Sequence, residues 1–153
     1  MYDKIIFTAE SGNCREFMAA AILEDIGLKW DIEIAARGLV VLFPEPLNQK
    51  AEAVMISNGL PTEGCMSSPL TIEDLEGNTL VLAMESKHRD KILELFEGID
   101  AEKVHVLSEF VGDEIEIMDP YGGTLQMYGL CYETLLASVR KLAAILNEGG
   151  SYE

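Results

Sequence analysis

The chain has 153 residues, 48% of them apolar, and a formal net charge of −16 at pH 7. This length and composition predict one folded domain over residues 1–153, with a hydrophobic core of its own. The negative charge argues against nucleic acid or an anionic membrane surface as a partner, and no apolar run is long enough to span a bilayer.

The first part of the chain predicts a strand, a tight turn, a helix and a second strand. Residues 5–9 form a continuous apolar run, which is typical of a strand buried on both faces of a parallel sheet. A helix is expected over residues 15–26, where apolar side chains recur at helical spacing and Gly27 supplies the stop. Alternating apolar residues predict a strand over 31–36 that ends near Gly38.

The middle of the chain predicts a helix, one helical turn and the clearest strand. Asn48 can cap a helix that continues through Ser57. Residues 71–74, Thr-Ile-Glu-Asp, have the spacing of a capping box with Asp in the fourth place, which indicates one helical turn. The apolar run over residues 79–84 predicts a central strand.

The last part predicts a helix, a short strand and a long helix. Ser86 is expected to cap a helix that reaches Phe96, and residues 103–107 form a short strand. Apolar side chains at helical spacing predict a final helix over 124–146, which Gly149 and Gly150 terminate.

Strands that alternate with helices predict an α/β fold. We expect a single three-layer domain, with an open four-stranded parallel sheet flanked by helices. Ligands of such folds bind beyond the carboxyl ends of the strands, and the turn after residues 5–9 lies there.

That turn has the features of an anion site. Its backbone N–H groups can converge next to a helix N-terminus, and the Arg15 guanidinium can hold two oxyanion oxygens. The sequence predicts phosphate binding by Glu10, Ser11, Gly12, Asn13, Cys14 and Arg15. The expected ligand is a phosphorylated residue or an inorganic oxyanion, bound weakly.

The cysteines and histidines indicate no cofactor and no metal. Cys14, Cys65 and Cys131 are widely spaced and odd in number, so they predict neither a disulfide framework nor a zinc site. His88 and His105 fall on separate elements. Without a recognisable signal peptide, the expected location is the reducing cytoplasm.

The turn and several later segments resemble the low-molecular-weight protein phosphatases, and most closely the bacterial phosphotyrosine and phosphoarginine branch. Residues 5–7 match the family's strand, Cys14-Arg15 its loop end, and Met18-Ala19 its helix start. Residues 67–71, 80–84 and 119–124 follow in the family's order and at its distances. The resemblance therefore covers most of the chain and implies the fold predicted above.

The same resemblance implies roles for four residues. It places Ala9 where the family carries its nucleophilic cysteine, and it makes Asp119 the general acid. It makes Arg15 the catalytic arginine that holds the equatorial oxygens of the phosphoryl group. Tyr121 would line the rim of the pocket. Glu16 and Phe17 replace the family's usual Ser-Pro, and we expect water to reach the Glu16 carboxylate.

Three functions remain open. The chain is expected to be a catalytically impaired homologue that retains an oxyanion pocket. Alternatively, it is an active protein tyrosine or arginine phosphatase in which Ala9 was introduced, or a non-catalytic protein-interaction module. Two readings of the loop also stay open: a shift by one residue would make Glu10 the nucleophile, and Arg15 could merely pair with Glu16 or Asp119.

Overall fold

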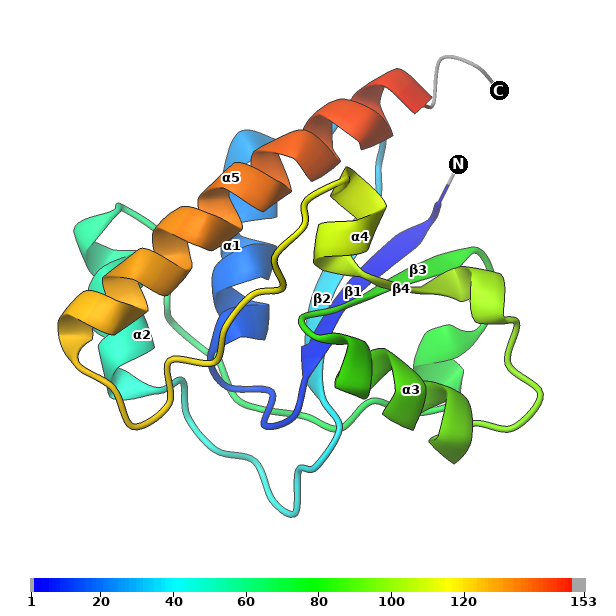
Figure 1. Ribbon diagram of the computed structural model, residues 1–153, viewed down its shortest axis with the longest axis horizontal. Coiled ribbons are helices and arrows are strands. Elements are labelled where there is room, and N and C mark those ends of the chain that lie inside the picture. The colour runs from blue at the N-terminus through cyan, green and yellow to red at the C-terminus, as the bar shows by residue number, and fades with distance from the viewer. Residues whose placement is uncertain (1, 150–153) are drawn as a thin grey trace.

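The computed structural model describes residues 2–149, and Figure 1 shows the strands and the helices that cover them. The strands are β1 (Lys4–Ala9), β2 (Glu33–Gly38), β3 (Thr79–Ala83) and β4 (Val104–Val106). The helices are α1 (Arg15–Ile26), α2 (Gln49–Ser57), α3 (Ser86–Leu95), α4 (Leu107–Val111) and α5 (Leu125–Gly149), with single turns η1 (Glu73–Leu75) and η2 (Ala101–Lys103). Within the described part, no helix is both long and apolar enough to cross a membrane.

The sheet is parallel throughout, with strand order β2-β1-β3-β4. In β1, Phe7 pairs with Ala36 on one side and with Leu82 on the other. Because β1 is an inner strand, the turn that follows it emerges between the carboxyl ends of β2 and β3. The predicted four-stranded parallel sheet is confirmed.

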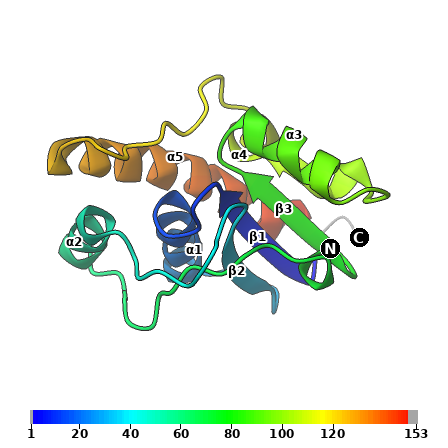
Figure 2. The same cartoon turned by 90° about the horizontal axis from the view of Figure 1, so that it is seen from below.

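Side chains of β1 alternate between two hydrophobic clusters, which explains why residues 5–7 of the strand are apolar without a break. Phe7 packs in the larger cluster with Met18 of α1 and Leu135 of α5. Ile6 points to the smaller cluster, with Ile92 of α3. Figure 2 shows α1 and α3 on opposite sides of the strands, so the sheet is the middle of three layers.

Several boundaries differ from the sequence prediction. The second strand begins two residues later than expected, at Glu33, and α4 follows β4 where no helix was predicted. The last helix continues past residue 146 to Gly149, so Gly149 does not stop it there; Gly150 lies outside the described residues. Buried residues of α5 extend to Leu146, and this packing on the core sustains the helix to its last turn.

Two of the three predicted caps are confirmed. The Asn48 side chain accepts hydrogen bonds from the N–H groups of Lys50 and Ala51, and caps α2. Thr71 and Asp74 bond reciprocally, since the Thr71 N–H donates to Asp74 Oδ2 over 3.0 Å and the Asp74 N–H to Thr71 Oγ1 over 3.3 Å.

The prediction that Ser86 caps α3 is wrong. Ser86 is the first helical residue, and Glu85 is the cap, in a reciprocal capping box with His88. The Glu85 side chain accepts from the third helical N–H, and the Glu85 N–H donates to His88 Nδ1 over 3.2 Å.

Candidate functional site

Carbonyl groups of the turn between β1 and α1 are bonded to neighbouring segments. The Val40 N–H donates to the Glu10 carbonyl over 2.8 Å, and the Asn48 N–H to the Asn13 carbonyl over 2.9 Å. Within the turn, Ser11 Oγ donates to Asn13 Oδ1 over 2.8 Å. Donors from outside thus hold the turn, here called the β1–α1 loop (residues 10–14), in a curve around the start of α1.

A contact between two glycines sets the shape of this loop. Gly12 has a φ of +75°, a conformation that L side chains rarely adopt. A Cβ atom on Gly12 would lie 2.8 Å from the backbone nitrogen of Gly38 and 2.9 Å from its Cα atom. The loop backbone therefore packs directly on the end of β2, at a distance that leaves no room for a side chain.

Replacing Gly38 with alanine is expected to lower the free energy of unfolding by about 1–3 kcal/mol. The new Cβ atom would lie 2.7 Å from the Gly12 nitrogen and 2.7 Å from the Ser11 carbonyl carbon, so backbone must move. Urea denaturation measures the change. The matched control is Gly129→Ala in α5, where the Cβ atom meets nothing within 4 Å and a gain of about 0.5–1 kcal/mol is expected. Equal effects of the two substitutions would contradict the role of this contact.

The loop borders a cavity of about 250 Å³ at the carboxyl edge of the sheet. Its lining residues are Ala9, Glu10, Ser11, Asn13, Cys14, Arg15, Glu16, Val40, Asn48, Asp119, Tyr121 and Tyr128. All predicted site residues except Gly12 line it; Gly12 instead shapes the backbone. The sequence had indicated Asn48 only as a helix cap and Tyr128 only as part of the helical stripe, so their place in the site was missed.

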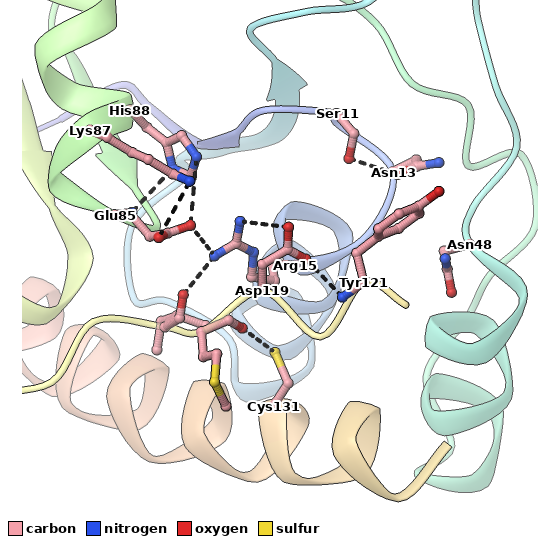
Figure 3. Close-up of polar contacts among 12 residues, drawn as sticks. Ser11, Asn13, Arg15, Asn48, Glu85, Lys87, His88, Asp119, Tyr121 and Cys131 are labelled. Atoms are coloured by element: carbon pink, nitrogen blue, oxygen red, sulfur yellow. Dashed lines mark hydrogen bonds and ion pairs between the residues drawn. The ribbon is translucent and has the colours of Figure 1, made fainter. Parts of the chain in front are cut away.

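Arg15 is buried, and it donates two hydrogen bonds and forms one longer ion pair. Its Nη1 donates to Glu85 Oε2 over 2.9 Å and to the Ile117 carbonyl over 2.6 Å. Its Nη2 lies 3.8 Å from Asp119 Oδ2. Figure 3 shows Arg15 between Glu85 and Asp119. The open interpretation that Arg15 pairs with Asp119 is thus correct in part, but its closest carboxylate is Glu85.

Glu85 is a site residue that the sequence analysis missed. It is the second residue after β3, and β3 lies beside β1 in the sheet. The carboxyl ends of adjacent parallel strands meet at one edge, which brings Glu85 to Arg15 across 70 residues of chain. The signal was therefore an acidic residue just after the clearest predicted strand.

Asp119 and Tyr121 lie at the mouth of the cavity. Asp119 Oδ1 accepts a hydrogen bond from the Tyr121 N–H over 3.0 Å, so the aspartate also stabilises its own turn. Its side chain is 49% exposed, and Tyr121 is 82% exposed. The Asp119 carboxylate is therefore open to solvent and also borders the cavity, where it can contact a bound group.

Glu16 is enclosed, contrary to the sequence expectation that water reaches its carboxylate. The residue is 1% exposed, because it faces inward from the first turn of α1. Burial raises its pKa to about 7. The nearby backbone N–H groups of Glu16 itself, Gly12 and Cys14 oppose that rise, as does the Arg15 guanidinium. The loop N–H groups thus face a carboxyl group of the protein itself.

The two sulfur atoms near the loop are thiols rather than thiolates at neutral pH. Burial is the largest cause that holds the pKa of Cys14 far above its usual range. Burial likewise raises the pKa of Cys131 to about 12, although Arg15 lowers it. Cys131 Sγ also lies 3.6 Å from the Met118 carbonyl. A neutral thiol is a poor nucleophile and a poor metal ligand.

Elsewhere in the described part of the chain, two features bear comparison with this site: a second groove and the arrangement of possible metal ligands. A groove of about 440 Å³ runs beside α1 and β2 and includes Phe17 and Cys65, but none of residues 9–16 borders it. In residues 2–149, no three side chains of His, Cys, Asp or Glu are placed to hold a metal ion. The cavity at the β1–α1 loop is therefore the candidate site.

The fold and this loop define an α/β protein whose ligand site lies beyond the carboxyl ends of a parallel sheet. Residues 4–151 match the family model described as low molecular weight phosphotyrosine protein phosphatase. The chain belongs to this family, as its resemblance predicted.

Three relatives show how far the similarity extends. The YwlE arginine phosphatase from Geobacillus stearothermophilus superposes with a TM-score of 0.90 at 30% identity, covering 98% of this chain and 96% of that one. The tyrosine phosphatase PtpB of Staphylococcus epidermidis is 31% identical over 139 residues, 91% of this chain and 96% of its own length. The tyrosine phosphatase Wzb from Escherichia coli K30, solved in complex with sulphate, shares the fold (TM-score 0.86, 23% identity, 95% of this chain and 99% of that one).

Proposed function

We propose that this chain is an oxyanion-binding member of the family that has lost hydrolysis through a phosphocysteine. One observation carries the proposal: the cavity contains no thiolate. Ala9, which the family resemblance places at the nucleophile position, ends β1 and borders the cavity with a methyl group. Cys14, the sulfur in the cavity lining, stays protonated because its pKa is raised by burial.

Neither of the two other candidate side chains in the loop, Ser11 and Glu10, is placed to replace the cysteine nucleophile. The Ser11 hydroxyl donates a hydrogen bond to the Asn13 side-chain oxygen, which is an amide and not a base. Glu10 is exposed on the loop wall. Removing a covalent nucleophile lowers the rate of an enzyme by on the order of 10⁶-fold, so the loss of the cysteine alone is expected to abolish detectable turnover.

Binding is a separate property from turnover and has separate support. The N–H groups of the loop converge on one carboxyl group, and such groups also bind phosphate and sulphate oxygens. Wzb, which has the same fold, is described with sulphate bound. The names of YwlE and PtpB suggest phosphoarginine and phosphotyrosine as the groups to test first.

Assays with p-nitrophenyl phosphate, phosphotyrosine and phosphoarginine test the loss of activity. We expect phosphate release no faster than in buffer, whereas sulphate is expected to raise the melting temperature, because a ligand of the native state stabilises it. Turnover well above buffer would contradict the lost activity. Absence of any stabilisation by sulphate or phosphate at any pH would instead favour a protein-interaction module.

The codon for residue 9 in the gene shows whether the alanine is natural, as this proposal requires, or was introduced in place of a cysteine. A cysteine codon would make the natural protein a phosphatase, with Arg15 and Asp119 in the roles that the family resemblance implies. An alanine codon is expected.

A further inference from the structure

The β1–α1 loop encloses a buried carboxyl group, that of Glu16. Glu16 is 1% exposed and borders the cavity, and its Oε2 atom has no hydrogen-bond partner among the described residues. A buried acceptor without a partner is costly, and native structures contain few of them. Oε2 therefore marks a place where a further donor or a proton belongs.

The surroundings of Glu16 have opposing effects on the ionisation of its carboxyl group. Burial favours the neutral acid, whereas the N–H groups of Gly12 and Cys14 and the Arg15 guanidinium favour the carboxylate. These opposing influences leave its pKa at about 7. Both charge states are thus accessible near neutral pH, and the carboxylate is the state that uses the N–H groups of the loop.

We propose that the loop takes up an oxyanion together with one proton, which Glu16 carries as a neutral carboxylic acid. An ionised Glu16 competes with an oxyanion for the same N–H donors and repels it. A neutral Glu16 releases those donors and offers its own O–H to an oxyanion oxygen. This inference rests on the proposed oxyanion binding and names the residue that regulates it.

Other titratable and charged groups lie around Glu16 and the cavity, and they come from five segments. They are Glu10 and Cys14 of the loop, Arg15 of α1, Glu85 and His88 at the start of α3, Asp119 of the cavity mouth, and Tyr128 and Cys131 of α5. Burial keeps the pKa values of both thiols and of Tyr128 above their usual values, so these groups stay neutral up to pH 8.5. Burial lowers the pKa of His88, which is neutral above pH 6.5.

Sulphate is the appropriate probe, because it does not change its own protonation between pH 6 and pH 8.5. Isothermal titration calorimetry with the full chain at these two pH values measures its dissociation constant. Above a pKa of about 7, each pH unit weakens binding tenfold if the neutral acid is required, so the constant should rise roughly 30-fold from pH 6 to pH 8.5. At pH 8.5, titrations in two buffers of different ionisation enthalpy should show uptake of one proton.

Glu16→Gln and Glu10→Gln make a matched pair of variants. Glutamine at position 16 has the size of glutamate but cannot ionise. Sulphate binding by this variant should therefore show neither the pH slope that Glu16 causes nor the uptake of a proton. Glu10 borders the same cavity but is exposed, and its replacement should keep the slope of the unmodified chain. Circular dichroism verifies that both variants fold.

The outcomes separate this inference from the proposed function. Sulphate binding with no pH slope in the unmodified chain, or a slope that persists in Glu16→Gln, would overturn the role of Glu16 and leave oxyanion binding intact. Failure of the unmodified chain and of the folded Glu16→Gln variant to bind sulphate at either pH would overturn oxyanion binding itself. If the pH slope were lost in Glu10→Gln and kept in Glu16→Gln, the proton would be carried by Glu10, and the assignment to Glu16 would be wrong.

Discussion

The double substitution Ala9→Cys with Glu16→Ser is expected to produce p-nitrophenyl phosphate hydrolysis on the order of 10⁴-fold above the unmodified chain. Ala9 ends β1 at the cavity, so a cysteine there would place its sulfur within the β1–α1 loop. The N–H groups and the helix N-terminus favour a thiolate at such a position. Initial rates at pH 6–7 measure the gain.

The single substitution Ala9→Cys is expected to gain at least 100-fold less. The buried Glu16 carboxylate raises the pKa of a neighbouring thiol and uses the N–H groups that a phosphoryl group needs. Ala9→Ser with Glu16→Ser is the matched control, because an alcohol supplies no thiolate at this pH. If the single and double cysteine variants were equally active, Glu16 would not be the second obstacle to catalysis.

Arg15→Met is expected to lower the free energy of unfolding by about 3 kcal/mol. Methionine keeps much of the side-chain length but leaves Glu85 Oε2 and the Ile117 carbonyl without the donor that they share. The Glu85 side chain is 22% exposed, which keeps the expected loss at the lower end of the range for broken buried pairs. Urea denaturation at pH 7 measures the loss.

Arg89→Met is the control for this substitution. Arg89 forms an ion pair with Glu109 over 3.1 Å, but both side chains are considerably more exposed than Arg15. Such surface pairs contribute about 0–1 kcal/mol. A loss at Arg15 no larger than at Arg89 would mean that the buried network stabilises neither the loop nor the fold.

The sequence predicted the fold well because its strongest signals are local. The apolar runs that became β1 and β3 are buried on both faces, and this burial requires no knowledge of distant residues. The caps at Asn48 and at Thr71 likewise follow from spacing over three residues. Boundaries such as the start of β2 depended on tertiary packing and were therefore less exact.

Two features of the site depended on contacts that spacing does not encode. The pairing of Arg15 with Glu85 requires β1 and β3 to be neighbours, an arrangement that the alternation of strands and helices leaves open. The enclosure of Glu16 was missed because an acidic residue in the first turn of a helix is usually solvated. Only packing beneath the loop removes it from water.

The direct meeting of Gly12 and Gly38 has a consequence for selectivity. Backbone atoms have no alternative rotamers. The spacing of the N–H groups in the β1–α1 loop is therefore fixed when the chain folds, and it does not adapt to the bound oxyanion. Discrimination among tetrahedral anions of similar size must then come from how many oxygens they present and how many protons they bring. The packing of the loop on the end of β2 thus sets the size of the oxyanion site, and the few side chains that line the cavity set its charge and its proton supply.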